Sequence, residues 1–160
     1  MIILSIGTNI GNRKLNIKNA ITALGQIGKI ITISPIYTSE PWGFESKNGF
    51  YNIALILESN LPPIELLNAT QQIERNLGRT TKTTTTYTDR IIDIDIIDYN
   101  NQIIDTQALT LPHKLMHKRN FVLYPLSDIA PDWQHPILKL SSTELKKISE
   151  DTSIIHILPQ

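Results

Sequence analysis

Two aspartates stand at alternate positions in the most isoleucine-rich stretch of the sequence, DRIIDIDIIDY, residues 89–99. Side chains of a β-strand alternate between its faces, so Asp93 and Asp95 would share one face and the isoleucines beside them the other. Carboxylates two residues apart on one face lie roughly 6.5 Å from each other, and at that separation they repel by about 2.5 kcal/mol at an effective dielectric constant of about 20. A divalent cation would turn this repulsion into attraction, because hard cations prefer oxygen ligands. The pattern favours a metal site, with a solvated sheet face as the alternative.

Arg79 and Arg90 flank the threonine-rich tract TTKTTTTYTD that precedes the two aspartates. Fixed cations beside a carboxylate pair suit phosphoryl transfer, which depends on positioning and on neutralising charged oxygens. Two surface salt bridges are the alternative interpretation. Gln71 and Glu74 lie one helical turn apart and could face the same end of the sheet, although a solvated polar helix face is the simpler interpretation.

The elements that must position these residues follow from hydrophobic periodicity and turn signals. A strand is predicted at residues 2–6, followed by the turn residues GTNIGN and a helix with one apolar face. Pro35 interrupts a bulged or edge strand over residues 30–39, and FYNIALILE (50–58) predicts the next strand. A second helix is predicted to begin at Pro62 and Pro63. The apolar faces of the two helices consist of Ile17, Ala20, Ile21 and Leu24 on the first, and of Ile64, Leu67, Ile73 and Leu77 on the second.

With residues 89–99 as the fourth strand, the order is β-α-β-β-α-β. This order predicts an α+β fold with a ferredoxin-like core whose helices cover one face of the sheet. Beyond residue 100 the pattern weakens, and we expect an extra C-terminal α/β segment with a short helix around residues 143–149. The length of 160 residues suits one domain, residues 1–160. The threonine tract and GFESKNG (43–49) are expected to be loops.

Composition excludes several classes of function. The sequence has no cysteine, so a disulfide framework and a thiolate zinc site are both excluded. His113 and His117 have no third zinc ligand of the usual type near them in the sequence. The formal net charge is zero, which argues against a general nucleic-acid partner. The apolar start MIILSI lacks the basic residues of a signal peptide and is too short to span a membrane, so we expect a cytoplasmic protein without a membrane partner.

Taken together, the segments resemble the hydroxymethyldihydropterin pyrophosphokinase family of folate biosynthesis. The R-x-x-D-I-D element, followed by a P-H and an R-x-F element, is specific in combination. The matching segments are IGTNIGN, FYN (50–52), LLNATQQIERNLGR (66–79), DRIIDIDI (89–96) and LPHKLMHKRNFVLYPLSDIAP (111–131). The resemblance implies magnesium-dependent transfer of pyrophosphate from ATP to the hydroxymethyl group of 6-hydroxymethyl-7,8-dihydropterin, with AMP as the second product.

The resemblance also implies roles for individual residues. Asp93 and Asp95 would hold two magnesium ions that bridge the ATP phosphates, and Arg79 and Arg90 would complete the catalytic set. The residues implied in ATP binding are Gln71, Glu74, Ile96, His113 and Arg119. Those implied in pterin binding are Ser39, Trp42, Phe50, Asn52 and Phe121, with the two phenylalanines on either side of the ring.

The sequence departs from the family pattern at several positions. Thr81 stands where a second arginine is usual, and we expect Lys82 to replace that arginine in part. Tyr87 replaces a usual tryptophan, Lys114 a usual tyrosine, and Ser39 and Trp42 a usual threonine and leucine. These differences affect the loops and the phosphate contacts, and leave both aspartates and both phenylalanines in place.

Two other functions share parts of this pattern. An RNA-binding or small-molecule-sensing ferredoxin-like module would present a basic sheet face, whereas the fourth strand here presents acids. A metal-dependent nucleotide-sugar transferase could use Asp93 and Asp95 as a D-x-D element, but the short chain leaves little room for that type of fold.

Overall fold

The computed structural model describes residues 1–40, 48–80 and 89–160. Its first half contains β1 (Ile2–Thr8), α1 (Arg13–Leu24), β2 (Lys29–Ile33), β3 (Tyr37–Ser39), β4 (Phe50–Glu58) and α2 (Pro63–Asn76). Its second half contains β5 (Asp93–Tyr99), β6 (Ile104–Asp105), β7 (Thr110–Leu111), the 3₁₀ helix η1 (Met116–Lys118), α3 (Asn120–Ile129), α4 (Ser142–Ile148) and β8 (His156–Ile157).

An antiparallel sheet with the strand order β5-β1-β4-β3-β8 lies at the centre, and β2 also pairs with β4. β1 lies between two of these strands, because it pairs with β4 on one side and with β5 on the other. The predicted interruption at Pro35 is confirmed, since β2 ends at Ile33 and β3 begins at Tyr37. The segment is expected to be bulged or to lie at an edge, and β2 has a register shift between Ile30 and Thr32.

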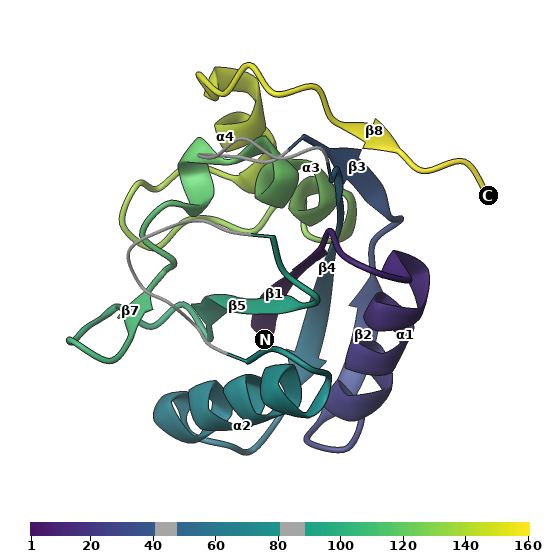
Figure 1. Ribbon diagram of the computed structural model, residues 1–160. Coiled ribbons are helices and arrows are strands. Elements are labelled where there is room, and N and C mark those ends of the chain that lie inside the picture. The colour runs from purple at the N-terminus through teal and green to yellow at the C-terminus, as the bar shows by residue number, and fades with distance from the viewer. Residues whose placement is uncertain (41–47, 81–88) are drawn as a thin grey trace.

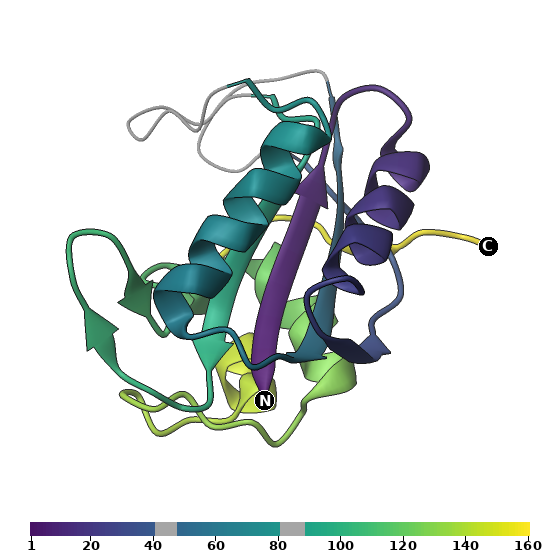
Figure 2. The same cartoon turned by 90° about the horizontal axis from the view of Figure 1, so that it is seen from below.

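The helices cover both faces of the sheet (Figures 1 and 2). α1 and α2 pack on one face, with Ile17 and Leu66 against Leu4 and Ile94. α3 and α4 cover the other face, in a second cluster of buried residues that includes Ile3, Ala54, Ile97, Val122, Leu126 and Leu145. The expectation of helices on one face is therefore correct for α1 and α2 and wrong for the chain as a whole, because the C-terminal segment supplies a second layer.

The inward face of α2 agrees with the predicted stripe only in part. Ile64 is exposed, whereas Leu66 is fully buried and Glu74 is buried beside Ile73. Leu67, Ile73 and Leu77 of the predicted stripe do pack in the first core cluster. Glu74 joins the buried face because it reaches the edge of β5, as described below. None of the helices in the described ranges is long and apolar enough to cross a membrane.

A bulge in β5 changes the face on which Asp98 lies. β1 pairs Leu4 with Ile96 but Ile3 with Asp98, so Ile97 is an extra residue in the strand. Simple alternation along residues 89–99 predicts that Asp98 lies on the same face as Ile94 and Ile96. The bulge instead places Asp98 on the face of Ile3, so that prediction is wrong. It is fully buried, which raises the pKa of its carboxyl, and it accepts a hydrogen bond from the backbone N–H of Asn101 at 3.0 Å. Asp98 lies within β5 and is not itself a turn residue, and this hydrogen bond joins it to the turn that follows the strand.

Candidate active site

The two predicted halves of the site meet on one face of the sheet. Gly7 pairs with Asn52 of β4 on one side and with Asp93 of β5 on the other. Directly paired residues project to the same face, and two strand spacings place the Cα atoms of Asn52 and Asp93 roughly 10 Å apart. A predicted pterin residue and a predicted metal ligand thus lie in one row across three strands.

Gly7 is suited to the middle of this row because it has no side chain. A Cβ at this position would lie 3.3 Å from Asn52 Oδ1 and 3.6 Å from Phe50 Cδ1. The two side chains of β4 therefore pack directly over the backbone of β1. Next to them, Asn52 Nδ2 donates a buried hydrogen bond to Ser39 Oγ at 2.7 Å. Three predicted pterin residues, Ser39, Phe50 and Asn52, are brought together here.

Two arginines converge on Asp93. Arg79 Nη1 donates to Asp93 Oδ1 at 2.7 Å and to the carbonyl of Ile92 at 3.3 Å. Arg90 Nη1 lies 3.5 Å from the same carboxylate oxygen. Arg79 is buried, so its interpretation as part of a surface salt bridge is wrong, and the pair interacts in a medium of lower dielectric constant than water.

Glu74 fixes the position of β5 from the side of α2. Its Oε1 accepts a hydrogen bond from the backbone N–H of Ile94 at 2.7 Å and lies 3.3 Å from Arg79 Nη1. β5 is an outer strand of the sheet, so its outward N–H groups need partners beyond the sheet. A solvated polar helix face is therefore the wrong interpretation for Glu74, while Gln71, one turn earlier, is half-buried.

A cavity of about 190 Å³ lies beside Asp95. Three of its lining residues, Asp95, Ile96 and His113, are predicted to bind ATP or its metal. The others are Leu67, Ile94, Ala108, Leu109, Thr110 and Lys114. The residues from the β6-β7 hairpin and its connection were missed in the sequence, because a short hairpin of ordinary composition carries no chemical motif.

His113 is oriented by the backbone around it. Its own N–H donates to the carbonyl of Ile97 at 2.9 Å, and its Nδ1 accepts from the N–H of Leu115 at 3.1 Å. The neutral ring therefore carries its proton on Nε2. Nε2 lies 3.9 Å from Asp95 Oδ2, so it points toward the same cavity.

Arg119 and Phe121 stand at the start of α3. Arg119 occupies the position before the first helical residue and is buried, while Phe121 is half-buried. The guanidinium carbon of Arg119 lies 5.5 Å from the centre of the Phe121 ring. The predicted phosphate contact and the predicted stacking ring are thus neighbours. Trp42, Thr81, Lys82 and Tyr87 lie outside the residues that the structure describes.

Asn9 is a site residue that sequence reasoning missed. It is buried, its Oδ1 accepts from the N–H of Arg90 at 2.6 Å, and its own N–H donates to the carbonyl of Arg90 at 3.0 Å. Its Nδ2 donates to Asp89 Oδ1 at 2.8 Å. Asn9 thereby fixes the backbone from which Arg90 reaches Asp93. The composition of GTNIGN indicates only a turn, and the one signal for this role is an asparagine placed directly after a buried strand.

The carboxylates suit magnesium in their chemistry. Within the described ranges, no cluster of three or more histidine, aspartate or glutamate side chains could enclose a metal ion. The side chains of Asp93 and Asp95 are 24% and 22% exposed, so both remain accessible. Magnesium commonly binds one or two protein carboxylates and completes its shell with water and substrate phosphates. Two accessible carboxylates therefore fit that ion.

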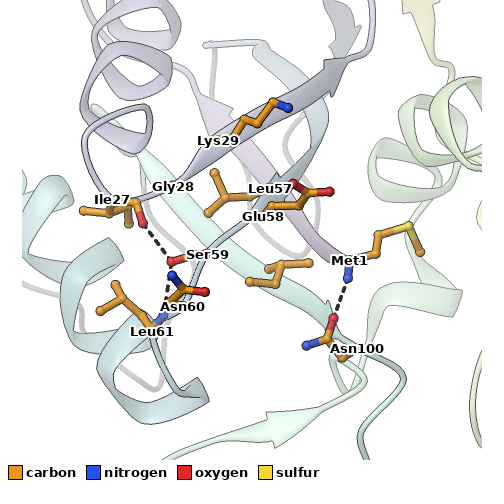
Figure 3. A pocket seen from close by; sticks show the side chains of 11 residues that line it. Met1, Ile27, Gly28, Lys29, Leu57, Glu58, Ser59, Asn60, Leu61 and Asn100 are labelled. Atoms are coloured by element: carbon orange, nitrogen blue, oxygen red, sulfur yellow. Dashed lines mark hydrogen bonds between the residues drawn. The ribbon is translucent and has the colours of Figure 1, made fainter.

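A larger cavity, of about 700 Å³, lies at the other end of the sheet, near the start of β1 and the end of β4. Figure 3 shows the residues that line this cavity, with Met1 beside Asn100 and with the side chains of Lys29 and Glu58. None of the predicted site residues lines this cavity. The chemistry-bearing groups are concentrated at the end of the sheet where Gly7 and Asp93 lie.

A family model described as 7,8-dihydro-6-hydroxymethylpterin-pyrophosphokinase matches residues 3–131. The matched range contains the whole candidate site described above. The chain belongs to this pyrophosphokinase family. The resemblance inferred from the sequence motifs is confirmed.

Relatives of this pyrophosphokinase cover most of its length. The 2-amino-4-hydroxy-6-hydroxymethyldihydropteridine pyrophosphokinase of Porphyromonas gingivalis is 44% identical over 139 residues, which cover 85% of this chain and 94% of that protein. The protein of the same name from Aquifex aeolicus is 38% identical over 143 residues, covering 89% of this chain and 88% of that one. Folic acid synthesis protein FOL1 of Dictyostelium discoideum is 39% identical over 159 residues, which cover 99% of this chain and 24% of that protein.

The fold is also similar to that of solved structures. The wild-type Plasmodium falciparum HPPK-DHPS crystallised with SDX-DHP matches with a TM-score of 0.74 and 16% identity, over 91% of this chain and 43% of that chain. At this identity the likeness concerns the fold alone. The pyrophosphokinase chain thus corresponds to less than half the length of that larger protein.

Proposed function

We propose that the protein transfers pyrophosphate from ATP to the hydroxymethyl group of 6-hydroxymethyl-7,8-dihydropterin, giving AMP and the pterin pyrophosphate. One observation carries the proposal: Asn52 and Asp93 lie in a single row on one sheet face, on either side of Gly7. A pterin held at Asn52 would have its reacting group within reach of phosphates held at Asp93. Membership in the pyrophosphokinase family supports the same reaction.

The pterin side of the site would combine stacking with hydrogen bonding. Phe50 and Phe121 would lie against the two faces of the ring, and Asn52 would pair with its polar edge. The hydrogen bond from Asn52 to Ser39 fixes the orientation of the amide. A fixed amide discriminates among ligands because a mismatched donor or acceptor would be left buried without a partner. Trp42, which lies outside the described residues, stays a predicted pterin residue.

The ATP side of the site would use fixed positive charge. Arg90, Arg119 and His113 would contact the phosphate oxygens, and Gln71, Glu74 and Ile96 would line the nucleotide. Arg79 holds Asp93 by a direct hydrogen bond, so this carboxylate keeps one orientation. The negative charge that develops on oxygens in phosphoryl transfer is stabilised by such preorganised groups.

Asp93 and Asp95 would hold magnesium together with the ATP phosphates. Bound magnesium would neutralise phosphate charge and lower the pKa of the pterin hydroxyl. His113, whose neutral ring donates from Nε2, would serve as a hydrogen-bond donor to phosphate. In this scheme none of the described side chains is required to act as a dedicated general base.

Product analysis tests the reaction. The protein is incubated with magnesium, the hydroxymethyldihydropterin and ATP labelled in its β-phosphate. AMP without label and a labelled pterin product are expected, and AMP should form only when the pterin is present. Labelled ADP as the product, or AMP formation that does not depend on the pterin, would contradict the proposal.

We also propose that residues 1–160 act as one catalytic unit with a ferredoxin-like core. The alternation of strands and helices and the strand order β5-β1-β4-β2 support this topology.

A cytoplasmic location stays a prediction, supported by the cysteine-free composition. A contact with a neighbouring folate-pathway enzyme is a further proposal. It is supported by the joined HPPK-DHPS name of the Plasmodium structure and by the longer Dictyostelium relative.

A further inference from the structure

The last residues of the chain contact the helix that carries Arg119 and Phe121. We call residues 151–158 the C-terminal strap. Asp151 Oδ2 accepts a hydrogen bond from the backbone N–H of Asn120 at 2.8 Å. In return, Asn120 Nδ2 donates to the backbone carbonyl of Asp151 at 2.9 Å. The strap is therefore joined by two hydrogen bonds to the residue between the predicted phosphate contact and the predicted stacking ring.

Asp151 supplies the cap that α3 lacks in its own sequence. Arg119 precedes the first helical residue, but its side chain makes no capping hydrogen bond. The first N–H groups of a helix need acceptors from outside the helix, and a carboxylate there also interacts favourably with the helix dipole. Asp151 meets both needs from 31 residues further along the chain. Its own orientation is fixed because Oδ1 accepts hydrogen bonds from the N–H and the hydroxyl of Ser153.

The other end of the strap reaches the opposite side of the proposed pterin site. β8 pairs with β3, with Thr38 opposite His156 and Tyr37 opposite Ile157. Leu158 adds a backbone hydrogen bond to the carbonyl of Ile36 at 2.7 Å. Figure 1 shows this yellow segment running from beside α3 and α4 to the edge of β3. β3 ends at Ser39 and α3 carries Phe121, so the strap bridges two of the elements that carry proposed pterin contacts.

We propose that Asp151 is a positioning residue for the proposed reaction. By capping α3 at Asn120, it sets the direction in which Arg119 and Phe121 leave the start of the helix. Arg119 would meet the phosphates and Phe121 the pterin, so a shift at Asn120 would affect the binding of both substrates. This inference rests on the proposed function of the site.

Contacts elsewhere keep α3 on the sheet when Asp151 is replaced. Tyr37 donates a hydrogen bond to the carboxylate of Asp128 in α3, and its ring packs edge-on against Tyr124 with 6.2 Å between ring centres. Val122, Leu123 and Leu126 are buried in the second core cluster. A variant without the cap is therefore expected to fold, with its change confined to the first turn of α3.

The test compares Asp151→Ala with Glu150→Ala. Glu150 is the adjacent exposed acid, so its replacement makes the same change in charge without touching α3. Steady-state AMP formation is measured with each substrate varied in turn. Asp151→Ala is expected to raise the KM of the pterin and of ATP by about fivefold, the factor that loss of a typical helix cap represents. Glu150→Ala is expected to leave both values unchanged.

Asp151→Asn separates the carboxylate charge from the hydrogen bond. It can still accept from the N–H of Asn120, but it loses the charge at the helix start, so a rise of about twofold in both KM values is expected. Hydrogen exchange at the Asn120 amide should become faster in Asp151→Ala and stay close to the unaltered rate in Asp151→Asn. This readout does not depend on activity.

The outcomes distinguish this inference from the proposed function. If the unaltered protein makes no AMP from ATP and the pterin, the proposed function fails and the inference fails with it. If the unaltered protein is active and both Asp151 variants keep its KM values, only the positioning role is overturned, even when their melting temperatures fall. If Asp151→Ala does not fold, unchanged KM values in Asp151→Asn overturn the role alone.

Discussion

Glu74 accepts a hydrogen bond from the backbone N–H of Ile94 at 2.7 Å, so a carboxylate of α2 is joined to the outer edge of β5. Ile94 lies between Asp93 and Asp95, and the contact therefore fixes the strand segment that carries both acids. The same carboxylate lies 3.3 Å from Arg79, which in turn holds Asp93. The candidate metal ligands are thus held from α2 as well as from the sheet.

Glu74→Ala is expected to lower the free energy of unfolding by about 3 kcal/mol. The substitution removes one of the carboxylates beside the buried Arg79, and it leaves the N–H of Ile94 without its acceptor. Urea unfolding followed by circular dichroism measures the change. Glu65→Ala, at an exposed acid of the same helix, is the control and should cost at most about 1 kcal/mol. Equal losses in the two variants would show that the buried contact contributes little.

Asp95→Asn is expected to reduce the rate of AMP formation by at least about a hundredfold, because several kcal/mol of charge stabilisation depend on a metal-binding carboxylate. Its stability should be equal or slightly higher, since one of two neighbouring negative charges is removed. Asp105→Asn, at an exposed acid in β6, is the matched control. An Asp95→Asn variant with the unaltered rate would remove Asp95 from the catalytic set.

Gly7→Ala is expected to raise the KM of the pterin by about tenfold, the scale of a modest overpacking cost, and to leave the KM of ATP nearly unchanged. The new methyl group would lie 3.3 Å from Asn52 Oδ1 and would push this amide from its place beside Ser39. Gly25→Ala adds the same group at the end of α1, away from the site. Equal effects on both substrates would indicate a general distortion of the sheet instead.

The free energy of unfolding is expected to fall in mild acid because of His135. Burial and, second, the nearby His117 lower the pKa of His135, and its Nδ1 accepts hydrogen bonds from the N–H groups of Ile137 and Leu138. Below the unfolded-state pKa of about 6.5, the unfolded chain binds a proton that the folded chain excludes. The contribution of neutral His135 to the free energy of unfolding is therefore fully present above about pH 6.5, the unfolded-state pKa. It is lost progressively as the pH falls from there toward the lowered pKa of the folded state.

Urea unfolding at about pH 7.5 and about pH 5.5 measures this dependence. His135→Asn keeps an acceptor for the two N–H groups but cannot take up a proton, so the stability of this variant should change less between the two pH values. Burial also lowers the pKa of His117, which is expected to keep part of the dependence in the variant. An identical pH dependence in both proteins would contradict the role of His135.

Local pattern was sufficient for the elements whose faces are set by their own residues. FYNIALILE begins and ends where β4 does, and the helix expected near residues 143–149 is α4. The alternation around Asp93 and Asp95 also predicted which side chains face the core, because Ile94 is buried while both acids are partly exposed. Alternation is a property of a single strand and needs no knowledge of its neighbours.

Features that depend on a partner segment could not be predicted in this way. The face of Asp98 changes because β1 and β5 pair with a bulge, and nothing in β5 alone specifies the register. The burial of Glu74 depends on the edge of β5, and the role of Asn9 depends on Arg90, 81 residues away. The motifs named the residues of the site, whereas long-range pairing decides which of them hold the others in place.

The bulge between Ile30 and Thr32 bears on how the protein behaves at high concentration. β2 is paired on one side only among the described strands, and it exposes Ile31 and Ile33. A flat apolar edge of this kind invites the same strand of a second molecule to add to the sheet, which is a route to aggregation. The bulge interrupts the regular spacing of N–H and carbonyl groups along that edge. We therefore expect the irregular strand to hinder self-association of the molecule through this edge of its sheet.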